Sequence, residues 1–218
     1  MSDQNLTDLA SDGIALLRNE PVQARSTARL ASLLDAAAAI IDEIGYERLT
    51  TAMVAERAGA SIGTVYRYFP DRIVVLQSLS ARSLGEFVEG TRATVLDSVH
   101  ATWLDALEAC IVAMTTAFRS LPGFRSLRLG DVLDVRPALT AQSGSTVVAA
   151  AAATAISERF GLPIEELADR LEVVLVVSDS LLARAFTYDS NGDSKLIDEA
   201  LKISRAYLTG FYGDPRSS

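Results

Sequence analysis

Apolar side chains recur along most of the chain at intervals of three and four residues, the spacing of one face of an α-helix. No segment shows the apolar–polar alternation, bounded by hairpin turns, that predicts a half-buried strand. Glycine and proline residues divide the pattern and mark where helices end. We therefore predict an all-α protein of about nine helices. Their expected ranges are 25–43, 51–58, 62–69, 71–90, 95–120, 124–130, 137–160, 164–188 and 194–212.

The first 24 residues stand apart from this pattern. Their apolar run, IALL, is too short for the core of an export signal, and acidic residues stand where such a signal carries positive charge. We expect residues 1–24 to form a flexible N-terminal extension.

Residues 51–69, TAMVAERAGASIGTVYRYF, predict two short helices joined by a tight turn. Gly59 can adopt the positive φ that such a turn requires. The Ser61 hydroxyl can cap the second helix by accepting from its first exposed amides. This combination is typical of a helix-turn-helix, whose second helix enters the DNA major groove. An ordinary helical corner with exposed tyrosines is the alternative.

The second helix of this motif has an inner and an outer face. Val65 and Phe69, four residues apart, are expected to point into the protein. The residues left to face outward are Ile62, Gly63, Thr64, Arg67 and Tyr68.

The formal net charge of −8 argues against a nucleic-acid-binding protein only until its distribution is considered. Residues 24–80 carry six arginines and six acidic residues, so the excess acid lies in the N-terminal extension and beyond residue 80. The segment expected to contact DNA is therefore neutral overall.

The stretch RLTTAMVAERAGASIGTVYRYFPDR, with the preceding LASLLDAAAAIIDEIGYE, resembles the N-terminal signature of the TetR (tetracycline repressor) family. The resemblance covers about residues 25–75; beyond residue 80 it is limited to an all-helical body of fitting length. It implies a helix-turn-helix DNA-binding domain at 25–72 and a ligand-binding and dimerisation domain at 73–218. Family members are typically dimeric repressors that a small molecule releases from a palindromic operator.

The DNA-binding residues implied by this resemblance are Thr51, Ser61, Ile62, Gly63, Thr64, Tyr66, Arg67, Tyr68 and Arg72. Thr51, the two tyrosines and Arg72 would contact the backbone, and the others, apart from the cap Ser61, would approach base edges. Whether Arg67 reads a guanine or contacts a phosphate is left open. Arg25 and Arg29 either reach the DNA or are simply solvated.

The body is expected to form a homodimer through its last two long helices, 164–188 and 194–212, which carry more apolar surface than one monomer face needs. The alternative is that both helices close the monomer core. Asp179 lies within an apolar run, so it should bind a ligand, pair with an arginine such as Arg184 or Arg170, or face the partner subunit. Candidate ligand-binding residues are Phe87, Trp103, Leu107, Met114, Phe118 and Asp179, although the apolar ones could equally be plain core.

Enzymatic chemistry has little support in the sequence. One histidine and one cysteine cannot form the usual metal cluster or Cys-His pair, and no nucleotide or hydrolase motif is present. We expect no metal, no cofactor, no membrane span and a cytoplasmic location. The predicted function is a ligand-responsive dimeric regulator that binds a palindromic double-stranded DNA operator and a largely apolar small-molecule effector. A helical dimeric protein-interaction scaffold, or a regulator without a ligand, is the alternative.

Overall fold

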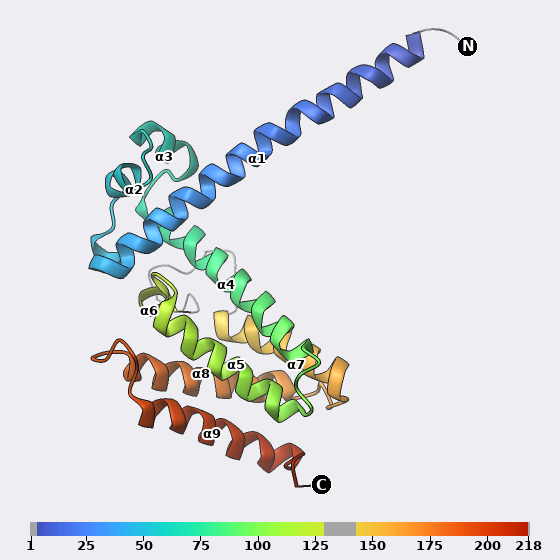
Figure 1. Ribbon diagram of the computed structural model, residues 1–218, viewed down its shortest axis with the longest axis vertical. Coiled ribbons are helices and arrows are strands. Elements are labelled where there is room, and N and C mark those ends of the chain that lie inside the picture. Colours follow the sequence, from blue (N-terminus) through green and yellow to red (C-terminus); the bar gives the residue numbers. More distant parts are fainter. Residues whose placement is uncertain (1–3, 129–142, 218) are drawn as a thin grey trace.

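The computed structural model describes residues 4–128 and 143–217, with side chains described from residue 24 onward. All regular elements in these residues are helices, which confirms the all-α prediction (Figure 1). In chain order they are α1 (Gln4–Ile44), the 3-10 helix η1 (Tyr46–Arg48), α2 (Thr51–Arg57), α3 (Ile62–Tyr68), α4 (Arg72–Leu96), α5 (Trp103–Ser120), α6 (Phe124–Leu127), α7 (Gly144–Phe160), α8 (Leu167–Ala185) and α9 (Ser194–Tyr212).

Side-chain caps determine where most of the helices begin. In each case a Ser, Thr or Asp oxygen accepts a hydrogen bond from a backbone N–H in the first turn, which satisfies a donor that has no partner within the helix. These capping residues are Thr50, Ser61, Asp71, Thr102, Ser143 and Asp193.

The break between α4 and α5 lies further along the chain than predicted. A helix end is predicted at Gly90, but α4 continues through Gly90 to Leu96. The break is set instead by Thr102 and Asp105, which form a reciprocal capping box at the start of α5. A single glycine costs a helix only about 1 kcal/mol, which packing along α4 can offset.

Helix α1 begins at Gln4 rather than near residue 25. Pro21, expected to mark a boundary, lies within it; proline removes one hydrogen bond from a helix without necessarily ending it. The secondary structure of residues 4–24 is therefore helix, and the flexibility expected of this extension stays a prediction. Of the predicted helix 137–160, residues 137–142 lie outside the described part, as do the last two residues of 124–130.

One hydrophobic core joins α1, α2, α3 and the first turns of α4, and we call this part of the chain the head. Two further clusters fill the body between α4, α5, α7, α8 and α9. Helix α4 contributes to both parts, and the domain boundary expected after residue 72 stays a prediction. None of the helices in the described residues is long and apolar enough to cross a membrane.

The short helix α6 connects the body to the head. Its Leu127 side chain is buried in the head core. The preceding Gly123 has φ +77°, and a Cβ there would lie 3.4 Å from the carbonyl oxygen of Ala38 on α1. The turn between α5 and α6 therefore packs directly on α1 and requires glycine.

Candidate functional site

The turn between α2 and α3 has the predicted helix-turn-helix geometry. Gly59 adopts φ +57°. The Ser61 side chain accepts a hydrogen bond from the backbone N–H of Thr64 at 3.1 Å, so its role as the cap of α3 is confirmed. Val65 and Phe69 each expose at most 1% of their surface, which confirms that they form the inner face of α3.

The first turn of α3 presents the side chains that were predicted to approach bases. Ile62 is 43% exposed and Gly63 is exposed, while Thr64 is half-buried beside Ser61. The Ser61 and Thr64 hydroxyls share a hydrogen bond of 2.9 Å, which fixes the Thr64 side chain. The outward surface of this turn therefore consists of the Ile62 side chain, the Gly63 backbone and the Thr64 hydroxyl.

Two of the predicted phosphate contacts lie together on one flank of α3. The Thr51 hydroxyl, at the start of α2, donates to the Tyr66 hydroxyl at 3.5 Å. Tyr66 is half exposed, so both oxygens can reach a group in solvent. A helix N-terminus and two hydroxyls form a suitable set of donors for a phosphate oxygen.

The opposite flank of α3 packs against α1. The Tyr68 hydroxyl shares a hydrogen bond of 3.1 Å with the Ser26 hydroxyl, and the Arg67 guanidinium lies 5.2 Å from the centre of the Tyr68 ring. The hydrogen bond from Ser26 and the charges of Arg67 and Arg29 lower the pKa of Tyr68. Tyr66 and Tyr68 thus lie on opposite flanks of α3.

Two other arginines of the head are already engaged. Arg72, the first residue of α4, donates to the backbone carbonyl of Glu47 at 2.6 Å, which ties α4 to η1. Arg57 forms two parallel bonds to Glu43 at 2.9 and 2.7 Å, and these hydrogen bonds lower the pKa of Glu43. The phosphate contact predicted for Arg72 stays a prediction.

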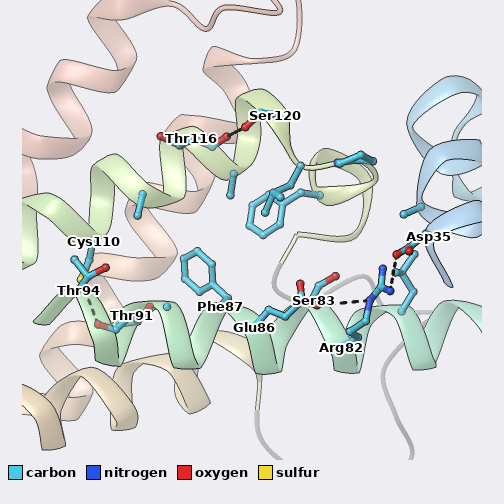
Figure 2. A pocket seen from close by; sticks show the side chains of 18 residues that line it. Asp35, Arg82, Ser83, Glu86, Phe87, Thr91, Thr94, Cys110, Thr116 and Ser120 are labelled. Carbon is cyan, nitrogen blue, oxygen red and sulfur yellow. Dashed lines mark hydrogen bonds and ion pairs between the residues drawn. The ribbon is translucent and has the colours of Figure 1, made fainter. Parts of the chain in front are cut away.

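A groove of about 570 Å³ lies between α4 and α5 and reaches α1 (Figure 2). We call it the α4–α5 groove. At its end Arg82 of α4 donates to Asp35 of α1 at 2.7 Å, so head and body meet at its rim. Its lining residues are Asp35, Ala38, Leu79, Arg82, Ser83, Glu86, Phe87, Gly90, Thr91, Thr94, Cys110, Ala113, Thr116, Ala117, Ser120, Leu121, Pro122 and Phe124.

A second, enclosed space lies behind the groove among α4, α5, α7 and α8. This inner cavity measures about 30 Å³ and is lined by apolar side chains apart from Thr91 and Cys110. It has room for about one water molecule and offers that molecule few polar partners. Phe87, Thr91 and Cys110 line both spaces and therefore separate them.

The predicted ligand-binding residues divide into two groups. Phe87, Leu107 and Met114 line the inner cavity. Trp103 is instead packed edge-on against Tyr212.

Phe118 lies in a cluster of rings with Phe124 and Phe186, and it lines neither space. Asp179 also lies outside both spaces and pairs with Arg128 through its carboxylate. Of the roles considered for Asp179, pairing with an arginine is the one observed, although Arg184 and Arg170 had been the expected partners.

Sequence reasoning missed most of the α4–α5 groove, including Arg82 and Asp35. The available signal was size: small residues such as Gly90, Ala113 and Ala117 face one another on α4 and α5 and leave space between the helices. Most of the aromatic residues predicted to bind the ligand instead fill the core.

The lone cysteine has little thiolate character. Burial raises the pKa of the Cys110 thiol to about 12. Thiolate is the reactive form, so Cys110 is poorly suited to redox sensing and behaves as a small apolar residue. Among the described residues, no three His, Cys, Asp or Glu side chains could together hold a metal ion.

Two segments of the chain, one near each end, match models of known protein families. A model described as bacterial regulatory proteins, tetR family, matches residues 33–78, and one described as tetracyclin repressor-like, C-terminal domain, matches residues 101–212. A TetR-family transcriptional regulator from Streptomyces coelicolor has a similar structure, with a TM-score of 0.69 and 30% sequence identity. That similarity covers 83% of this chain and 97% of the other.

Two curated relatives match shorter parts of the chain. The fatty acid metabolism regulator protein of Bacillus subtilis is 28% identical over 104 residues, which are 48% of this chain and 51% of that protein. The HTH-type transcriptional repressor KstR of Rhodococcus jostii is 46% identical over 50 residues, 23% of this chain and 24% of that repressor. The chain thus spans about half the length of the first relative and a quarter of the second.

Proposed function

We propose that this chain, which belongs to the TetR family of bacterial regulatory proteins, is a dimeric transcriptional repressor. A small molecule would release it from its DNA operator. As a member of that family, the chain is a DNA-binding transcriptional regulator. Repression, dimerisation and release by a ligand are the proposed part. The observation that carries the proposal is the α4–α5 groove, which contacts the head and the body at once.

The groove has the size and chemistry of a small-molecule site. Its volume of about 570 Å³ lies within the usual range of ligand pockets, about 300–1,000 Å³. Most of its wall is apolar, and its hydroxyl groups include those of Ser83, Thr91 and Thr94. We infer an effector that is largely apolar with a few polar atoms. Rotation of Phe87 would open the inner cavity to the same molecule, because that side chain borders both spaces.

A ligand in the groove could alter DNA binding through the contact between Asp35 and Arg82. This pair links α1 of the head to α4 at the rim of the groove (Figure 2). Leu79 and Ala38, which also line the groove, belong to the head core. A molecule that pushes α4 away from α1 would therefore move the head relative to the body. Since a ligand shifts an equilibrium only by its differential affinity, it must bind one arrangement better than the other.

The outer faces of α8 and α9 support dimerisation. Val173 and Val176 on α8, and Ile203 and Phe211 on α9, are each between 43% and 53% exposed. Two neighbouring helices that both expose large apolar side chains are a suitable surface for a two-fold dimer. Such a dimer would present two copies of α3 to the two halves of a palindrome.

The proposal can be tested with the purified full-length chain. Selection from random duplex DNA should yield a palindromic operator, and the mass of the complex should correspond to two chains per duplex. Compounds are then screened for release of that operator. Recovery of no preferred sequence, or a complex with one chain per operator, would contradict the proposal.

A pair of matched variants tests the location of the ligand. Ala113→Phe fills the α4–α5 groove, whereas Ala93→Phe adds the same ring on the exposed surface of α4 outside it. Ala113→Phe should bind the operator and lose the response to the effector, and Ala93→Phe should respond like the parent. Equal responses from the two variants would exclude the groove as the effector site.

A further inference from the structure

A second groove, rich in arginine, lies between α1 and the end of α3. We call it the α1–α3 groove; it is open, and its volume is about 770 Å³. Segments about forty residues apart in the sequence form its two sides. Its lining residues are Arg25, Ser26, Ala28, Arg29, Ser32, Arg67 and Tyr68.

The charge of this groove is unbalanced. Three guanidinium groups line it, and none of the lining residues whose side chains the structure describes is acidic. Arg25, Arg29 and Arg67 form no ion pair with any acidic side chain whose position is described. A concave surface that gathers several charges of one sign attracts ligands of the opposite sign.

The contact between Tyr68 and Ser26 holds the two sides of the groove together. Their hydroxyls lie 3.1 Å apart and join the last residue of α3 to α1. Arg67 lies beside the Tyr68 ring, 5.2 Å from its centre, and faces this groove. The surface of α3 predicted to approach bases lies mainly on its first turn, around Ile62 to Thr64. The guanidinium of Arg67 is therefore grouped with two arginines of α1 rather than with that surface.

We propose that the α1–α3 groove binds phosphate groups of the DNA backbone, and that Arg67 supplies charge there rather than reading a base. The inference rests on the function of the chain as a DNA-binding regulator. A guanidinium matches the oxygens of a phosphodiester with its parallel N–H donors. With the Thr51–Tyr66 pair on the other flank, α3 would then have a contact to the DNA backbone on each of its two sides. Sequence discrimination is then left to Ile62, Gly63 and Thr64.

The test compares a selected operator with a mismatched duplex of the same length. Arg25→Ala, Arg29→Ala and Arg67→Ala should each weaken binding to both duplexes by the same factor, about threefold to tenfold. Each should also reduce the slope of log affinity against log salt by about 1. Arg67→Lys, which keeps the charge but loses the parallel donors, should keep the salt slope of the parent and weaken binding to both duplexes by the same factor, less than Arg67→Ala does.

Arg92→Ala is the control, because Arg92 is an exposed arginine of the body that pairs with Glu158. It removes the same charge at a distance from the groove and should leave the salt slope unchanged. A change in the operator-to-mismatch ratio for Arg67→Ala or Arg67→Lys would show that Arg67 reads a base and would overturn the proposal. Unchanged affinity in Arg25→Ala and Arg29→Ala would overturn the proposal that the α1–α3 groove binds phosphate groups. A parent chain that selects no duplex would instead contradict the function on which the inference rests.

Discussion

Gly63, on the turn of α3 that is proposed to face DNA, is not required by the fold of the protein. Its φ is not positive, and a Cβ at this position would meet only the Ser61 hydroxyl oxygen, at an ordinary 3.9 Å. Glycine in a helix costs about 0.5–1 kcal/mol relative to alanine. Gly63→Ala should therefore raise the free energy of unfolding by about 0.5 kcal/mol, the lower figure because residue 63 lies in the first turn. For a chain of this size the melting temperature should rise by about 1–2 °C.

The same substitution should weaken DNA binding. The added methyl group lies on the exposed surface of α3, between the helix backbone and the groove it would enter. We expect at least about a tenfold loss of affinity for the operator, or about 1.4 kcal/mol. Urea unfolding measures the first effect, and fluorescence anisotropy with a labelled operator duplex measures the second.

Gly59→Ala is the matched control, four residues earlier in the same motif. A Cβ at position 59 would have no neighbour within 4 Å, but φ is +57°. Only backbone strain should act, and it should lower the free energy of unfolding by about 1 kcal/mol. A Gly63→Ala variant that is less stable than the parent would refute the helix-propensity argument. One that binds the operator as tightly as the parent would show that DNA does not closely approach this glycine.

Two further predictions concern ion pairs of the body. Asp179→Asn should lower the free energy of unfolding by about 1–2 kcal/mol in urea titrations, because the charge-assisted contact between Arg128 and the Asp179 carboxylate is lost. Loss of effector response at unchanged stability would instead make Asp179 a ligand contact. Hydrogen bonds from Thr102 and Arg216 lower the pKa of Asp105 below its ordinary value of 3.8. Ionised Asp105 therefore stabilises the folded chain at neutral pH, and this contribution is lost as the pH falls from 3.8 through the lowered pKa. The stability difference between Arg216→Ala and the parent should shrink over that range, and a constant difference would exclude the Asp105 pair as its source.

The helix-turn-helix could be predicted from sequence because its determinants are local. The cap at Ser61, the left-handed Gly59 and the four-residue spacing of Val65 and Phe69 each depend on residues within a few positions along the chain. Interactions of this range leave a direct signature in the order of residue types. The same holds for most helix ends, which follow from capping residues.

The grooves could not be predicted because they depend on packing between distant segments. Ser26 meets Tyr68 across 42 positions, Arg82 meets Asp35 across 47, and Arg128 meets Asp179 across 51. Periodicity indicates that a helix face is buried, but it does not say against which other face. For this reason the sequence identified Asp179 as unusual and missed its partner.

Helix α4 belongs to the cores of both the head and the body, and its length has a mechanical consequence. At 1.5 Å per residue, its 25 residues form a rod of about 37 Å. A tilt of about 5° at the body end would displace the far end by about 3 Å, close to the rise of one DNA base pair. In the proposed dimer two such rods would set the distance between the recognition helices, which must match one helical turn of DNA, about 34 Å. The distance between the recognition helices would therefore respond to small rotations of α4. In the proposed mechanism, a modest change at the α4–α5 groove would suffice to put both recognition helices out of register with the operator.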